Sequence, residues 1–288
     1  MTQRILRSLL AAALAAAAAW VAPARAADWS TTELQFQYGK LDNAFAPGSQ
    51  NTPILTLQHA SGWKYGDNFF FVDLIDQTDD DNYDAYAEIY LNLSLGKITG
   101  KNLGLGPIRD FGIIGGLNWA ADANAQAWLP GVRLAWDLPG FAFANTDFMA
   151  YLTDNPGGDG AAPQEDDSWM VDFNFATKQL ALWKSKWNIE GHVEYVAERD
   201  NEFGVTKAWV LAQPQLRLDL GNLLGLGANT LFAGIEYQYW MNKLGGSTDE
   251  NAVQALLVWR LSAPFPGPHK ARAPAGTRAF AWRVYPSA

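Results

Sequence analysis

The sequence predicts an all-β protein: a single antiparallel transmembrane β-barrel of about twelve strands, preceded by a cleaved signal peptide. Apolar and polar residues alternate with period two in segments of roughly 9 to 13 residues, the length that a tilted strand needs to cross a hydrocarbon core. Aromatic residues gather at the ends of these segments, as Trp and Tyr do at membrane interfaces. No apolar run after the N-terminal region is long enough for a transmembrane helix.

The N-terminal region has the pattern of a signal peptide over residues 1–26. Arg4 and Arg7 precede an Ala-rich apolar run, and Ala24-Arg25-Ala26 has the small-x-small form of a cleavage site. The alternative is a membrane anchor, but the run is shorter than the roughly 20 apolar residues that cross a bilayer. We therefore expect secretion, with the barrel at residues 27–261.

Twelve candidate strands follow, and the number is even. They lie near 31–41, 52–60, 67–76, 83–94, 109–120, 126–136, 142–152, 168–177, 186–197, 205–217, 229–241 and 251–261. The odd-numbered links are rich in Asn, Gly, Pro and acidic residues, which predicts exposed loops on one rim. An even count then predicts a protein of the Gram-negative outer membrane with both termini in the periplasm.

Two even-numbered links, 96–106 and 219–227, are longer than tight turns and weakly repeat one another as NLGLG and LLGLG. Residues 262–288 contain five Pro, four basic residues and no acid, which predicts a disordered basic tail. This tail is either a genuine appendage or a frameshifted reading of the gene.

The two faces of each strand differ in the way that a water-filled barrel requires. In 84–94, Ala85, Ala87 and Ile89 fall on one side, and Tyr86 and Glu88 fall on the other. Hydrocarbon offers no hydrogen bonds, whereas a wet lumen tolerates carboxylates and amides. The alternative for the aromatic residues is the core of a soluble β-sandwich.

Charge and composition exclude several functions. All 30 acidic residues but only 14 of the 21 basic ones lie between residues 27 and 262, which disfavours nucleic-acid binding. The chain has no Cys and only three His, so cysteine-ligated metals and multi-histidine centres are not expected, and neither is any cofactor.

Motifs for an enzyme are also missing, so we expect no catalysis. The enzyme class that comes nearest to the sequence pattern is a barrel lipase with His192 as its base, which requires a Ser beside the His. His192 instead shares its face with Glu190 and Glu194, and no Ser lies on that stretch. The triplet Asp79-Asp80-Asp81 lacks the spaced oxygens of an EF-hand, so we interpret it as a solvated loop rather than a Ca²⁺ site.

The alternation predicts a solute-binding lumen wall. Phe rings that face water are unfavourable unless something flat stacks on them, and amides, carboxylates and guanidinium groups lie between them. Such a wall suits a planar base with a hydroxylated sugar, although these residues could instead merely fill a narrow barrel. The predicted substrate-binding residues are Asp67, Phe69, Phe71, Asp73, Tyr86, Glu88, Tyr90, Asn92, Arg217 and Glu236.

The stretch Trp63-Lys64-Tyr65-Gly66-Asp67-Asn68-Phe69-Phe70-Phe71-Val72-Asp73, followed by Ala87-Glu88-Ile89-Tyr90 and Leu103-Gly104-Leu105-Gly106-Pro107, resembles the nucleoside-specific channel-forming porins of Gram-negative outer membranes, the Tsx-like family. The resemblance spans about 28–261. It implies a monomeric twelve-stranded channel for passive nucleoside diffusion, embedded in outer-membrane lipid, which in some members is a phage receptor. The basic tail departs from the family. A general or plugged barrel that acts as a surface receptor or adhesin is the alternative function.

Overall fold

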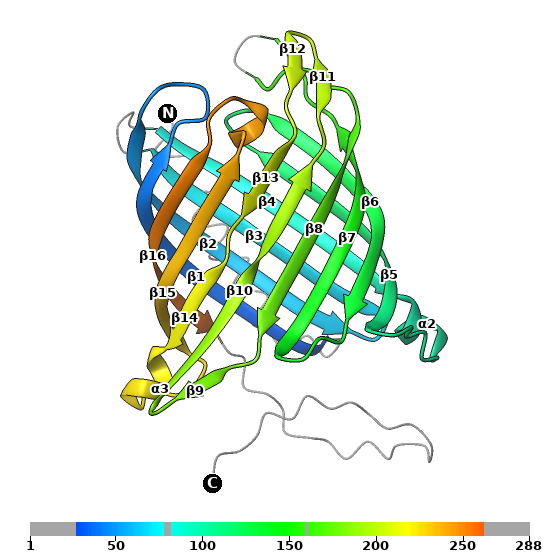
Figure 1. Ribbon diagram of the computed structural model, residues 1–288, viewed down its shortest axis with the longest axis vertical. Helices are drawn as coiled ribbons and strands as arrows, with labels where there is room; N and C mark the ends of the chain where they lie inside the picture. Colours follow the sequence, from blue (N-terminus) through cyan, green and yellow to red (C-terminus); the bar gives the residue numbers. More distant parts are fainter. Residues whose placement is uncertain (1–26, 78–81, 159–160, 262–288) are drawn as a thin grey trace.

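The computed structural model describes residues 27–77, 82–158 and 161–261, which form one antiparallel β-barrel (Figure 1). The predicted signal peptide at 1–26, the Asp79–Asp81 triplet and the predicted tail at 262–288 lie outside the described residues. Within the described part, no helix is long and apolar enough to cross a membrane.

Sixteen strands are present in the described residues, and the predicted strand positions agree with them within a few residues, except for one. They are β1 (Ala27–Asp42), β2 (Ser49–Trp63), β3 (Gly66–Gln77), β4 (Asn82–Ser94), β5 (Ile108–Ala120), β6 (Ala125–Trp136), β7 (Phe141–Thr153), β8 (Ser168–Thr177), β9 (Leu180–Leu182), β10 (Ser185–Val196), β11 (Arg199–Asn201), β12 (Gly204–Thr206), β13 (Trp209–Ala212), β14 (Gln215–Asp219), β15 (Leu231–Met241) and β16 (Glu250–Leu261).

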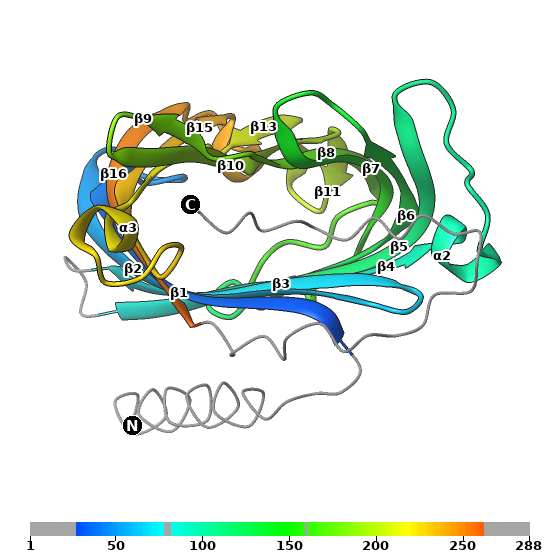
Figure 2. The same ribbon diagram turned by 90° about the horizontal axis from the view of Figure 1, so that it is seen from below.

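The barrel closes with twelve strand positions in its wall. Each strand of the wall pairs with the next along the chain, and β16 pairs with β1. The short strands β13 and β14 together occupy one position, between β10 and β15. Closure matters because a membrane offers no partner to an unpaired strand edge. In Figure 2 the barrel is flattened, with β1–β4 on one side and β10, β13 and β15 on the other.

The predicted strand 205–217 is the exception, because it is interrupted. Its first residues belong to β12, which pairs with β11 in a hairpin that extends past the barrel rim. The pairing with β10 then breaks at Gln213-Pro214, since proline has no N–H to give to a ladder. Gly191 lies opposite this break, with φ +149° and no room for a Cβ against the Gln213 carbonyl.

Two short helices occupy the long even-numbered links. They are α2 (Leu95–Thr99) and α3 (Leu220–Leu224), each capped at its N-terminus by a side chain, Ser94 or Asp219, and ended by a glycine in the left-handed conformation. We call the end of the barrel that carries α2, α3 and the start of β1 the helix end, and the opposite end the loop end (Figure 1).

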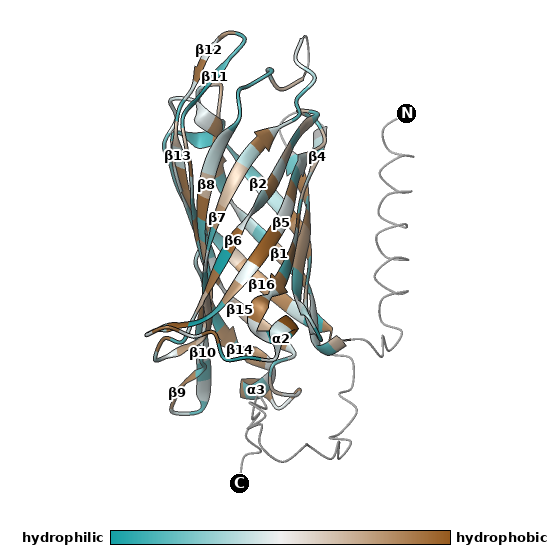
Figure 3. Cartoon of the chain, turned by 90° about the vertical axis from the view of Figure 1, so that its right-hand side faces the viewer, coloured by the Kyte–Doolittle hydropathy of each residue, from teal (hydrophilic) through white to brown (hydrophobic). Residues whose placement is uncertain are grey.

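Hydrophobic and hydrophilic residues alternate along the strands (Figure 3), and the large apolar residues that face outward are exposed over the middle of the barrel. Phe36, Ile89, Ile113, Val132 and Val253 are 47–58% exposed there. Trp119, Trp128 and Trp169 are likewise exposed and lie at the loop-end limits of their strands, as an interfacial girdle requires. A soluble sandwich would bury such residues, so the exterior is a lipid-facing surface.

Trp240, near the loop-end limit of β15, differs from Trp119, Trp128 and Trp169. It lies on the inner face and packs against a cluster of buried apolar residues, although its neighbour Tyr239 faces outward. The strict alternation of β15 places only one of the two at the membrane surface.

Replacing Leu257 with Arg puts a charge in the middle of the lipid-facing side of β16. We expect the free energy of unfolding in lipid vesicles to fall by about 2–4 kcal/mol, the usual cost of Arg near the bilayer midplane. Denaturant titration followed by tryptophan fluorescence measures the change. Leu244→Arg, in the loop between β15 and β16, is the matched control, and equal losses for both would contradict a lipid-facing β16.

Candidate functional site

The ten predicted substrate-binding residues all lie on the inner face of the barrel. On β3 and β4 the register pairs Asp67 with Asn92, Phe69 with Tyr90, Phe71 with Glu88 and Asp73 with Tyr86, so the eight side chains share one surface. Arg217 and Glu236 lie on β14 and β15, on the opposite part of the flattened wall. The structure therefore places the eight on one surface, with Arg217 and Glu236 across the lumen from them.

Aromatic rings form a continuous track along β3 and β4. The ring centroids of Phe69 and Phe71 are 6.1 Å apart, and those of Phe71 and Tyr86 are 5.9 Å apart. The hydroxyl groups of Tyr86 and Tyr90 donate to the two oxygens of Glu88, at 2.6 and 3.0 Å. The four rings are half-buried, so they leave apolar surface exposed inside the barrel.

Glycines on β5 make room for this track, a role that could not be predicted from the sequence pattern. A Cβ at Gly116 would lie 2.6 Å from the Tyr90 ring, and a Cβ at Gly112 would lie 2.1 Å from the Asn92 side chain. Tyr90 and Asn92 therefore lie flat against the neighbouring strand instead of extending across the lumen.

An arginine links the track to the adjoining wall. Arg133 on β6 donates two hydrogen bonds of 2.7 Å to Asp147 on β7, and its third contact is Asp67 on β3 at 3.0 Å. Asn92 also donates to Asp67, at 2.9 Å. The bidentate contact between Arg133 and Asp147 fixes the guanidinium group at the helix end of the aromatic track.

A second arginine cluster closes the part of the wall formed by β14, β15, β16 and β1. Arg217 is 1% exposed and contacts Glu33 at 3.1 Å and Glu190 at 2.6 Å. Arg260 holds the other Glu33 oxygen at 2.6 Å. Arg217 and Glu33 are therefore buried in this cluster, whereas Glu190 and Arg260 keep part of their surface exposed.

His192 occupies the end of a directed chain of hydrogen bonds. Glu250 accepts from Lys243 and from the Gln238 amide, which accepts in turn from Gln213 at 2.8 Å. Gln213 can then only accept from Nε2 of His192, at 2.9 Å, while Nδ1 faces a carboxylate oxygen of Asp172 at 3.0 Å. Both ring nitrogens therefore donate, and the imidazole carries a positive charge.

Asp172, His192 and Glu194 offer three ligand atoms within 4.8 Å of one another. A metal ion needs a free nitrogen lone pair on the histidine, and both His192 nitrogens are used as donors. Among the residues that the structure describes, the hydrogen-bond partners of the His192 ring are Asp172 and Gln213 rather than a hydroxyl nucleophile, unlike those of the base of a hydrolase.

The loop end carries a contact that the sequence did not indicate. Arg199 at the start of β11 binds Glu165 of the β7–β8 loop at 2.6 Å, and its guanidinium lies 4.9 Å from the Tyr151 ring and 4.7 Å from the Trp209 ring. Inner-face apolar residues lie below this contact. They are Ile114, Ala127, Leu129, Met149, Met170, Val196 and Trp209.

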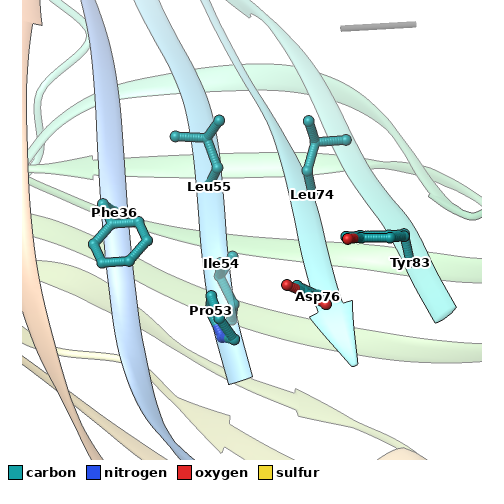
Figure 4. Close-up of a pocket in the computed structure, with 7 residues that line it drawn as sticks. All are labelled: Phe36, Pro53, Ile54, Leu55, Leu74, Asp76 and Tyr83. Carbon is teal, nitrogen blue, oxygen red and sulfur yellow. The ribbon is translucent and has the colours of Figure 1, made fainter. Parts of the chain in front are cut away.

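A separate apolar hollow lies outside the lumen, on the lipid-facing side of β1–β4 (Figure 4). Phe36, Leu55 and Tyr83 line it and are each more than a third exposed. It is part of the membrane surface and contains none of the predicted substrate-binding residues.

Replacing Arg217 with Met leaves Glu190, and in part Glu33, without a cationic partner in a packed interior. We expect the free energy of unfolding to fall by about 3–5 kcal/mol, measured by denaturant titration in vesicles. Arg109→Met, at the exposed start of β5, should change it little. The double variant Arg217→Met/Glu190→Gln should recover part of the loss, and no recovery would contradict the role of the ion pair.

No protein-family model and no curated protein matches this sequence. Among solved structures the chain is similar to a bacterial polysaccharide outer membrane secretin, with 10% identity and a TM-score of 0.43 over 80% of this chain and 98% of the other. It is similar to the beta domain of the Bordetella autotransporter BrkA, with 11% identity and a TM-score of 0.37 over 82% and 100% of the two chains. It is also similar to the translocator domain of the autotransporter NalP from Neisseria meningitidis, with 11% identity and a TM-score of 0.34 over 90% and 98%. These proteins share the class of fold alone, and the Tsx-like family stays a prediction.

Proposed function

We propose that this barrel is a channel of the Gram-negative outer membrane through which nucleosides and related small solutes diffuse passively. The observation that carries the proposal is the half-buried aromatic track of Phe69, Phe71, Tyr86 and Tyr90 on the inner face. Exposed rings inside a polar lumen are unfavourable unless a planar solute covers them.

The groups beside the track suit the rest of such a solute. Carboxylates of Asp67, Asp73 and Glu88 accept hydrogen bonds from sugar hydroxyls, and Asn92 offers an amide. Several weak contacts in sequence favour passage over retention, because a solute must leave each site as readily as it enters. The proposal includes no catalytic step and no cofactor.

The orientation follows from the two ends. We place the loop end at the cell exterior and the helix end, with both termini, in the periplasm, since long loops commonly face outward and short links inward in such barrels. Exposed loops are then the surface available to a phage. The barrel is proposed to act as a monomer in outer-membrane lipid.

Liposome swelling tests the channel. Vesicles that contain the barrel should swell faster with nucleosides than with sugars of similar mass, and Phe71→Ala should remove most of that difference because it shortens the stacking surface. Phe148→Ala, on the lipid-facing side of β7, is the matched control. Equal rates for nucleosides and sugars in the unmodified protein would sink nucleoside selectivity.

Charge gives a second expectation. The lumen wall is rich in carboxylates, so nucleotides should enter less readily than nucleosides through repulsion. In planar bilayers, adenosine should block the channel current more strongly than AMP at equal concentration. Equal block by the two would contradict a repulsive lumen.

A plugged surface receptor or adhesin is the second candidate function. The contact of Arg199 with Glu165 beside buried inner-face apolar side chains favours it, because a plugged barrel needs side chains packed together inside its wall. A barrel of this kind would give neither conductance in a planar bilayer nor solute-dependent swelling. Phage adsorption would then depend on the loops alone.

A further inference from the structure

Four carboxylates on the inner face form no close ion pair with another described residue, although the charged imidazole of His192 lies within 4.8 Å of one of them, Glu194. Asp73, Glu88, Glu194 and Glu236 come from β3, β4, β10 and β15, and within the described residues no Lys, Arg or His forms an ion pair with any of them. Other acidic residues of the lumen do have such partners, as Asp147 has Arg133 and Glu33 has Arg217. The four therefore stand out by their chemistry.

These carboxylates face one another across the flattened barrel. The charge of Asp73 interacts with those of Glu88 and Glu236, and the charge of Glu194 interacts with that of Glu88. The positive charge of His192 offsets part of the charge on Glu88, Glu194 and Glu236, and Asp73 has no such neighbour among its main interactions. The hydrogen-bond donors to the four carboxylates are neutral: Thr56 for Asp73, two tyrosines for Glu88, Trp209 for Glu194, and Gln215 and Gln254 for Glu236. We call these four residues the carboxylate ring.

An unsatisfied acceptor beside the ring is an independent sign of a missing cation. Gln254 is fully buried on the inner face of β16, and its amide nitrogen donates to Glu236 at 2.9 Å. The carbonyl oxygen of the same amide therefore lies beside that carboxylate, yet it has no hydrogen-bond partner in the described part of the chain. A buried acceptor next to carboxylates calls for a donor or a positive charge.

The aromatic track borders the ring on one side. Asp73 and Glu88 alternate with Phe71 and Tyr86 in the paired register of β3 and β4, and both rings are half-buried. Aromatic faces attract ammonium groups through their quadrupole, and carboxylates bind the N–H donors of the same groups. A bare inorganic ion would use the oxygens and gain less from the rings.

We propose that the carboxylate ring is a cation site of the lumen and that its ligand is a small organic solute with an ammonium group. The inference rests on the proposed channel and adds the charge class of its solutes. Rings of Asp and Glu select cations in other pores by the same electrostatics. Asp73 and Glu88 hold the ammonium group beside the track, and Glu236, Glu194 and the Gln254 carbonyl complete the ring.

Calorimetric titration of the purified full chain in detergent tests the site without any need for conduction. Putrescine dihydrochloride is the probe, and 1,4-butanediol, which has the same length and no charge, is its matched control. We expect a saturable isotherm for the diamine and none for the diol. Similar heats for both, or none for the diamine, would overturn the proposal.

Variants locate the binding. Asp73→Asn and Glu236→Gln should each weaken putrescine at least about tenfold, as expected for the loss of one charge-assisted contact. Asp137→Asn, at the exposed β6–β7 turn, should bind as the unmodified protein does. Circular dichroism shows whether each variant forms a barrel. If Asp73→Asn or Glu236→Gln does not fold, Glu88→Gln is tested in its place. Undiminished binding in folded ring variants would place the ligand elsewhere.

Two comparisons separate the remaining possibilities. A potassium chloride isotherm as strong as that of the diamine would assign the ring to an inorganic ion and overturn the ammonium ligand. The swelling assay decides the channel separately. Diamine binding without swelling leaves the cation site intact and rejects the channel, whereas nucleoside-dependent swelling without diamine binding does the reverse.

Discussion

The structure depends on one constraint: in hydrocarbon, every backbone N–H and C=O must find its partner within the protein. A sheet satisfies this only if its first and last strands meet, and here β1 pairs with β16 over Thr32 to Tyr38. Once the wall is closed, the alternation of side chains leaves no freedom in what faces where. Phe36 must meet lipid because Gln35 and Gln37 point inward, and the same holds around the barrel.

That constraint explains why the sequence predicted so much of the fold. Alternation alone identified the inner face of β3 and β4, because lipid and water select opposite residues at each step. The interrupted strand at Gln213-Pro214 was missed for a related reason: its residues keep the alternation across the break, and only the missing N–H of proline marks it. The hairpin of β11 and β12 extends past the barrel rim, where both of its faces meet water and no alternation of apolar and polar residues is required.

Pairings across the lumen could not be predicted from sequence. Arg133 and Asp67 are 66 residues apart, and Arg217 and Glu33 are 184 apart, so nothing local links them. The sequence identified these residues as inward-facing and polar but not which of them neutralise one another. Arg217 illustrates the difference, since it lies buried between Glu33 and Glu190, two partners that the sequence did not indicate. The roles of Gly112 and Gly116 could not be predicted either, because glycine has no side chain and so contributes nothing to the alternation of apolar and polar residues.

The inner wall divides into regions with different consequences. Where arginines pair with acids, around Arg217 and Arg133, the charges cancel and the side chains link strands of the barrel wall. Around Asp73 and Glu236 the charges cancel only in part, through His192 and Arg217 beside Glu236, although each carboxylate has neutral donors. Burying an uncompensated charge is unfavourable, and neutral hydrogen bonds offset only part of that cost. A barrel that needed only stability would have no use for such a ring, whereas a barrel that passes solutes gains from a region left incomplete until the solute arrives.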